Sequence, residues 1–190
     1  MTGSLPTAST SRAQPEDGPL RMLSRLHART LAQCAELCAL AAHVAACGCD
    51  EQARRASQAA LHYFDTCPPQ YRADEEKDLF PALLESMAGS DAVCLRDLTW
   101  EMTRQHRAAD AMWQRLREPL AALAGGQSAT LEGAAVQAFA ALHRSQIERE
   151  ETELLPMAAR LLTDDALEQL WASMRERHGE PIQGPSPRRV

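Results

Sequence analysis

The residues of this sequence that could do chemistry form a repeated pattern. A Glu-Glu-x-x-Leu-(Phe/Leu)-Pro segment occurs twice, at residues 75–81 and 150–156. Each copy is preceded by an Arg-x-His sequence, which supplies His27 before the first copy and His106 before the second. Such self-similarity indicates two related hairpins, each with a histidine helix and a carboxylate helix. Imidazole and carboxylate groups from facing helices are also the ligands of metal sites in helical bundles.

The acidic and imidazole groups fall on apolar stripes. Residues three or four apart share one face of a helix, so Glu75, Glu150, His27 and His106 each continue a line of apolar side chains. The four stripes are Leu61-Phe64-Tyr71-Glu75-Leu79-Leu83, Val136-Phe139-His143-Gln146-Glu150-Leu154, Leu98-Met102-His106-Trp113-Leu120 and Leu23-His27-Leu31.

Burying these groups requires compensation. A lone buried carboxylate costs several kcal/mol unless it is paired, protonated or bound to a cation. Taken singly, each glutamate is more simply explained as solvated, and each histidine as a hydrogen-bonded core residue. The arrangement occurs in both hairpins, however, and this repetition favours convergence on a metal.

The elements that must position these groups are helices. Glycines and capping residues separate the helical stretches, no segment alternates as a strand does, and Pro68 and Pro69 are expected to kink or interrupt the second helix. The expected helices span residues 20–47, 51–87 with Asp50 as the N-cap, 91–123, 128 or 130 to 162, and a short one at 164–177. Short connections make successive helices antiparallel. The predicted fold is all-α, an up-down-up-down four-helix bundle with a short C-terminal helix.

Length and composition limit the domain organisation and the partners. A chain of 190 residues suits one domain, predicted at 20–179, with a disordered tail at 1–19 and a flexible tail at 180–190. The formal net charge of -6 argues against nucleic acid as a partner. No run approaches the ~20 uninterrupted apolar residues of a membrane span. The polar N-terminal stretch lacks the apolar core of an export signal, so we expect a cytoplasmic protein with reduced cysteines.

At these residues the sequence resembles the hemerythrin-like, or HHE cation-binding, family. The resemblance covers about residues 21–179. It rests on His27, on the segment from Tyr63 to Pro81, on His106 ahead of Trp113 and on the segment 150–156. It implies a hemerythrin-like four-helix bundle around a non-haem di-iron centre.

The resemblance also implies a ligand set. His27 and His106 would be iron ligands and Glu75 and Glu150 the bridging carboxylates, with Glu151 as the alternative to Glu150. Where relatives carry histidine one turn before each glutamate, this sequence has Tyr71 and Gln146. The position after Tyr71, which is often a second histidine in relatives, is Arg72 in this sequence. One type of relative also has a histidine one turn after the histidine of the third helix, and here that residue is Asp110.

These replacements change the chemistry expected of the site. A tyrosine phenolate can bind ferric iron once the metal displaces its proton. An amide oxygen is a poorer ligand for a transition metal than imidazole. The predicted metal ligands are therefore His27, Tyr71, Glu75, His106 and Glu150, with Asp110 as a candidate third carboxylate. Such an oxygen-rich set favours a harder, more oxidised ion and disfavours reversible oxygen carriage.

Two functional hypotheses follow. The first is an iron-binding protein that senses or handles oxygen, nitric oxide, peroxide or iron, with a small diatomic molecule or peroxide as its ligand. The second is a metal-free bundle that acts as an interaction or structural protein, as a homodimer or with a partner protein, in which Arg72 pairs with Glu75 or Glu76. No nucleophile motif, phosphate loop or nucleotide fingerprint favours an enzyme.

The cysteines suggest a third kind of site. Cys34 and Cys38 lie one turn apart, and His43, Cys47 and Cys49 follow, a set of donors that suits zinc or cuprous copper. Cys34 and Cys38 also extend the His27 stripe, so core packing explains them better.

Overall fold

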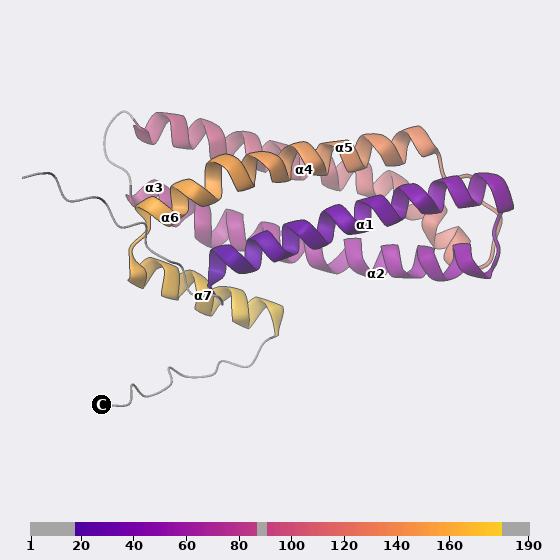
Figure 1. Cartoon of the computed structure of the whole chain (residues 1–190), viewed down its shortest axis with the longest axis horizontal. Coiled ribbons are helices and arrows are strands. Elements are labelled where there is room, and N and C mark those ends of the chain that lie inside the picture. The colour runs from indigo at the N-terminus through magenta and orange to yellow at the C-terminus, as the bar shows by residue number, and fades with distance from the viewer. Residues whose placement is uncertain (1–17, 87–90, 180–190) are drawn as a thin grey trace, which may run out of the picture.

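The computed structural model describes residues 18–86 and 91–179, and within these ranges every element is a helix. The elements are α1 (Pro19–Cys47), α2 (Glu51–Asp74), the π-helix η1 (Glu75–Leu79), α3 (Phe80–Ser86), α4 (Asp91–Ala124), α5 (Gly133–Arg149), the π-helix η2 (Glu150–Leu154), α6 (Leu155–Leu161) and α7 (Asp164–His178). Figure 1 shows α2–η1–α3 and α5–η2–α6 as two continuous rods beside α1 and α4, with α7 packed at one end. The predicted all-α four-helix bundle is confirmed. Apart from Gly18 and Pro19, the two predicted tails lie outside the described residues.

Local signals in the sequence explain where several helices begin and end. The Asp50 side chain accepts a hydrogen bond from a backbone N–H of the first turn of α2 at 2.8 Å, as the predicted N-cap should. Thr163 caps α7 in the same way. Gly48 ends α1 and Gly179 ends α7, each with a positive φ that a residue with a Cβ rarely adopts.

Two helix boundaries differ from the expected ones. Helix α2 continues through Pro68 and Pro69. Of the two expected effects of these prolines, a kink or an interruption, the interruption is wrong. Pro68 is buried, and the packing of this face holds the helix together despite the missing N–H groups. Helix α5 begins at Gly133, later than the expected 128 or 130. The side chain of Leu131 is buried in the core just before the helix starts.

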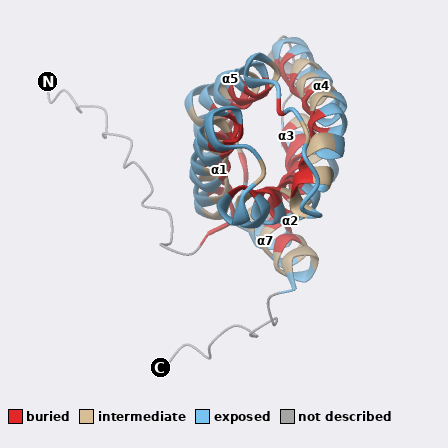
Figure 2. Cartoon of the chain, turned by 90° about the vertical axis from the view of Figure 1, so that its right-hand side faces the viewer, coloured by how far each residue is buried: buried red, intermediate tan, exposed pale blue. Residues whose placement is uncertain are grey.

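The four long rods surround one core. Figure 2 shows their buried faces turned toward a common axis, with α1 and α4 on opposite sides and α2 and α5 on the other two. Each histidine helix therefore packs against both carboxylate helices. This diagonal arrangement lets one side chain from each rod reach the same interior point.

Helix α1 has the length and apolar composition of a membrane-spanning helix, although no uninterrupted apolar run predicts one. In the bundle its buried residues face the core, and His27 is among them. Its apolar character is thus accounted for by the contacts with α2 and α5.

A buried carboxylate attaches α7 to the bundle. Asp74, fully buried at the end of α2, accepts hydrogen bonds from Arg177 and from His178 Nε2, the latter at 2.7 Å. Arg177 also donates to Asp78 at 2.7 Å. Asp74 directly precedes Glu75, so α7 is anchored next to the acidic pair of η1.

We predict that Asp74→Asn lowers the free energy of unfolding by about 1–3 kcal/mol, because Arg177 and His178 lose the buried carboxylate that binds them. Denaturant unfolding followed by tryptophan fluorescence measures this, since Trp171 lies on α7. The control is Glu51→Gln, whose exposed pairs with Arg54 and Arg55 should contribute under about 1 kcal/mol. Equal effects of the two substitutions would contradict the anchoring role.

Candidate metal centre

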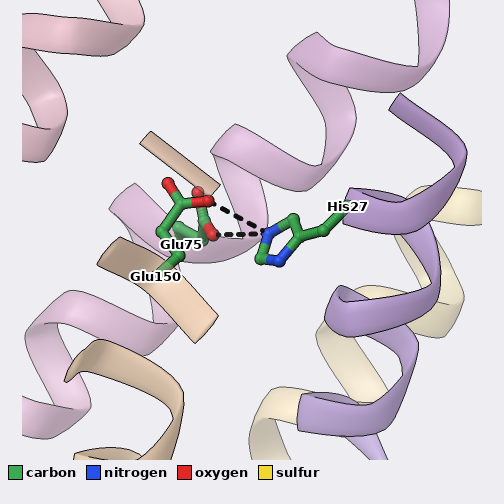
Figure 3. A group of neighbouring side chains, drawn as sticks. All are labelled: His27, Glu75 and Glu150. Carbon is green, nitrogen blue, oxygen red and sulfur yellow. Dashed lines mark ion pairs between the residues drawn. The ribbon is translucent and has the colours of Figure 1, made fainter. Parts of the chain in front are cut away.

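Four buried ionisable side chains meet in the middle of the bundle. His27 comes from α1, Glu75 from η1, His106 from α4 and Glu150 from η2, and each is at most 1% exposed. Figure 3 shows the His27 ring facing the carboxylates of Glu75 and Glu150. The structure therefore brings four of the five predicted ligands together.

The four groups close into a ring. His27 Nε2 lies 3.4 Å from Glu75 Oε1 and 3.2 Å from Glu150 Oε2. His106 Nε2 lies 3.3 Å from Glu75 Oε2 and 3.5 Å from Glu150 Oε1. Each glutamate thus presents one oxygen to each imidazole, which is the arrangement of a carboxylate that bridges two positions.

The spacing of the donor atoms fits a cation. These separations are longer than the usual N–H···O distance of about 2.9–3.0 Å. Ligand atoms held about 2.0–2.1 Å from a tetrahedral ion are about 3.3–3.4 Å apart. Neither the two imidazole Nε2 atoms nor the two Glu75 oxygens has a hydrogen-bond partner, although all are buried. Such orphaned atoms mark a place where a further group is expected.

The second glutamate of each pair orients a histidine. Glu151 Oε1 lies 2.6 Å from His27 Nδ1, and Glu76 Oε1 lies 2.6 Å from His106 Nδ1. These short contacts hold Nδ1 as the donor and turn Nε2 toward the ring, the arrangement of carboxylate–histidine–metal triads. Glu151, expected as the alternative to Glu150, is half-exposed and holds His27 from outside the ring.

The two π-helices explain how consecutive glutamates reach different places. The N–H of Phe80 bonds to the carbonyl of Glu75, and that of Leu155 to Glu150, five residues back in each case. Pro81 and Pro156 follow one residue later, where an α-helical hydrogen bond is lost in any case. Each π-turn spans one residue more than an α-helical turn. Such π-bulges occur frequently at functional sites.

A comparison with known proteins agrees with this geometry. The family model for the hemerythrin HHE cation-binding domain matches residues 18–158. The chain belongs to the hemerythrin family. No curated protein matches the sequence. Membership supports a cation-binding function. Within the described part of the chain, three residues of the ring, His27, Glu75 and Glu150, have donor atoms close enough together to hold one ion.

Tyr71, the fifth predicted ligand, lies beside His27 in this hemerythrin-like bundle. Its side chain is fully buried, and its ring meets that of His27 edge-on, with centroids 5.6 Å apart. The hydroxyl has no hydrogen-bond partner. Burial, with the negative charges of Glu150 and Glu75, raises the pKa of Tyr71 well above 10. Without a cation the phenol therefore stays protonated.

Gln146 takes the equivalent position on α5 but faces the other end of the ring. Its Nε2 donates to Glu150 Oε1 at 2.9 Å, and its buried Oε1 has no partner. The amide thus satisfies the glutamate oxygen that faces His106. It supports the ring as a hydrogen-bond donor in this arrangement.

Arg72 and Asp110 do not take the roles that the sequence suggested. Arg72 donates to the carbonyl of His106 at 3.1 Å and pairs with Asp110, and it makes no ion pair with Glu75 or Glu76. The Asp110 side chain is 56% exposed. It therefore binds Arg72 at the surface and is not a third carboxylate of the ring.

The ring balances its own charge. Burial opposes protonation of His27, but Glu151, Glu75 and Glu150 together raise its pKa to about 10. The pKa of His106 rises to about 11 against the same opposition, through Glu150, Glu75 and Glu76. The two imidazoles in turn lower the pKa of the buried Glu75 to about 2. A cation that binds here must displace protons from the imidazoles.

His143 is a buried polar residue that the sequence placed on the inward stripe without assigning it a role. Neither ring nitrogen has a hydrogen-bond partner. Its ring packs edge-on against Phe139 at 4.7 Å and lies 6.1 Å from Phe64. Burial, together with the charges of Arg72 and His106, lowers the pKa of His143 to about 3. It is a neutral imidazole between the ring and the aromatic core.

The cysteines do not form a metal site with His43 in the described part of the chain. Cys34 is buried, and burial raises the pKa of its thiol to about 12, so it is a core residue as expected. The Cys49 thiol donates to the carbonyl of Leu123 at 3.5 Å, and His43 pairs with Asp50.

We predict that His143 makes the protein less stable in acid. Unfolded His143 gains a proton near pH 6.5, whereas in the folded state it stays neutral to about pH 3, so stability falls as the pH drops through this interval. His27 and His106, whose pKa values are raised in the folded state, favour folding more as the pH falls from 7 through 6.5. Their contribution opposes the loss from His143 and is common to the two variants compared below. Relative to pH 7, His143 should cost up to about 2–3 kcal/mol at pH 4.5.

Denaturant unfolding of metal-free protein at pH 7 and pH 4.5 measures this effect. His143→Leu should reduce the loss between the two pH values, and His62→Leu, at an exposed position, should not. Identical pH profiles for the two variants would show that His143 is not buried as a neutral group.

Proposed function

We propose that this hemerythrin-like protein binds non-haem iron in the ring of His27, Glu75, His106 and Glu150, and uses it to sense or handle oxygen, nitric oxide, peroxide or iron. One observation carries the proposal. Each of the two glutamates presents one oxygen to His27 and the other oxygen to His106, at distances of 3.2–3.5 Å, deep in an apolar core. Family membership supports a cation as the ligand.

The donor set favours iron in a higher oxidation state. Two carboxylates and the adjacent phenol of Tyr71 are hard oxygen ligands, and two imidazoles complete the set. The thiols are elsewhere: Cys34 is packed in the core and Cys49 bonds to the carbonyl of Leu123. A bound iron ion would supply a redox-active centre at which a small diatomic molecule or peroxide could coordinate.

The surrounding residues would prepare the site. Glu76 and Glu151 fix the imidazole tautomers. Leu79 and Leu154, both fully buried, follow the glutamates along η1 and η2 and help to keep water from the centre. We further propose that the protein works in the cytoplasm and passes the state of the site to a partner protein or to a second copy of itself.

The alternative is a metal-free bundle that acts as an interaction or structural protein. It is favoured by the charges in the ring: two cationic imidazoles offset the buried carboxylates of Glu75 and Glu150 without a metal. The two further carboxylates, Glu76 and Glu151, are partly exposed to water. In that case the ring is a buried ion network, and added iron should not change stability.

Metal analysis of protein purified without chelator separates the two. We expect stoichiometric iron in the wild type and little in His27→Ala or in Glu75→Gln, while the exposed-site control His62→Ala keeps its iron. Iron at about 100 times its dissociation constant should stabilise the wild type by about 2.7 kcal/mol. Iron-replete wild type without bound metal, and with no thermal shift on adding iron, would establish the metal-free alternative.

Glu76 and Glu151, the glutamates that bind the histidine Nδ1 atoms, provide a second prediction. Glu151→Gln should weaken iron binding about 10–100-fold, because it removes the charge that orients and polarises His27. The control is Glu153→Gln two residues later, where the carboxylate is exposed and pairs with Arg149. Iron titration of the metal-free variants measures both affinities. An unchanged affinity in Glu151→Gln would show that this contact does not prepare the site.

A further inference from the structure

The two ends of the ring are not equivalent, although the repeat gives them the same backbone. At one end His27 Nε2 lies 3.2 Å from Glu150 Oε2 and 3.4 Å from Glu75 Oε1. Donor atoms of these three residues all lie within 4.8 Å of one another, and within the described ranges this is the group of three that could hold one ion. His106 stands outside that group, at the opposite oxygens.

The His27 end has a further ligand in reach. The buried hydroxyl of Tyr71 has no partner, and its ring lies against that of His27. The negative charges of Glu150 and Glu75 help to raise the pKa of this phenol, so Tyr71 lies within the electrostatic influence of both carboxylates. A cation at this end would therefore find an imidazole, two carboxylates and a phenol that can lose its proton to the metal.

At the His106 end the residue that corresponds to Tyr71 is Gln146, which is not an equivalent ligand. The Nε2 of Gln146 donates a hydrogen bond to Glu150 Oε1, which is the oxygen that faces His106. This hydrogen bond occupies one lone pair of Glu150 Oε1, which is then less available to a cation. The amide group of Gln146, unlike a phenol, does not become an anionic ligand.

A fixed positive charge also lies at the His106 end. Arg72, nearly buried, donates to the His106 carbonyl. The corresponding residue of the other hairpin, 75 positions later, is the apolar Ile147. Asp110 pairs with the guanidinium at 2.5 Å, and the positive charge of Arg72 also acts on the phenol of Tyr71. The charge of Arg72 therefore does not by itself distinguish the two ends, and the asymmetry rests on Tyr71 and Gln146.

We propose that the site is asymmetric and binds one ion tightly at the His27 end, through His27, Glu75, Glu150 and Tyr71. A second ion at the His106 end binds far more weakly. This inference rests on the proposed function and specifies its stoichiometry and its ligands.

The test is a titration of metal-free protein with ferrous iron under anaerobic conditions, with bound iron per chain measured after desalting. Wild type should retain about one ion. Gln146→His, which places an imidazole at the poor end, should retain a second. Retention of two ions of equal affinity by the wild type would overturn the asymmetry and leave the proposed function intact. Absence of any bound ion would overturn the proposed function itself.

Spectroscopy tests the tyrosine separately. Wild type loaded with ferric iron should show a visible phenolate-to-iron charge-transfer band. Tyr71→Phe should abolish the band and weaken the tight ion at least about tenfold. The matched control is Tyr63→Phe, since Tyr63 is also buried but bonds to Thr30 at 2.8 Å; it should keep both the band and the affinity.

A band that survives in folded Tyr71→Phe, or a Gln146→His variant that still retains one ion, would contradict the assigned ligands. Far-ultraviolet circular dichroism and thermal unfolding establish that each variant is folded. The stoichiometry of the wild type does not depend on any substitution, so it decides the asymmetry even if one variant fails to fold.

Discussion

Charge placed in an apolar interior must be balanced locally, and the ring of two imidazoles and two carboxylates is how this bundle meets that constraint. Each group comes from a different rod, and each is at most 1% exposed. Water cannot solvate them, so every charge depends on its neighbours in the ring. Moving any rod by a fraction of a turn would leave a charge unpaired. The diagonal arrangement of the histidine and carboxylate helices is thus tied to the site, and the site to the arrangement.

The backbone solves a second problem, which is how two adjacent glutamates serve different purposes. In each hairpin the first glutamate enters the ring and the second bonds to a histidine Nδ1 from the rim. The π-turns at η1 and η2 re-phase the helix at this point, so that Leu79 and Phe80 are both buried although they are adjacent. The same is true of Leu154 and Leu155. The proline that follows makes the wider turn less costly, because its missing N–H would break the α-helical ladder anyway.

The sequence predicted the bundle and the inward direction of the ring residues, because apolar spacing records which face of a helix is buried. It did not predict the π-helices, since α-helical periodicity assumes a constant turn. The roles of Glu76 and Glu151 were missed for the same reason. Arg72 was assigned to the glutamates on its own helix, but its partners, Asp110 and the His106 carbonyl, lie on α4. Contacts between helices depend on how each helix is rotated about its own axis and shifted along the bundle. The sequence of a single helix does not determine either of these.

The two hairpins show which parts of the site the scaffold requires. Both keep the histidine, the glutamate pair, the π-turn and the proline, so these features together hold the rods in register. One turn before the glutamate they differ, with Tyr71 in one hairpin and Gln146 in the other. Both side chains are fully buried, so each fills the core adequately, and the fold does not demand one or the other. The position is buried in both hairpins, but the size and the chemistry of its side chain differ between them. The bundle can therefore change the ligands at one end of its ring without changing the framework that brings the ring together.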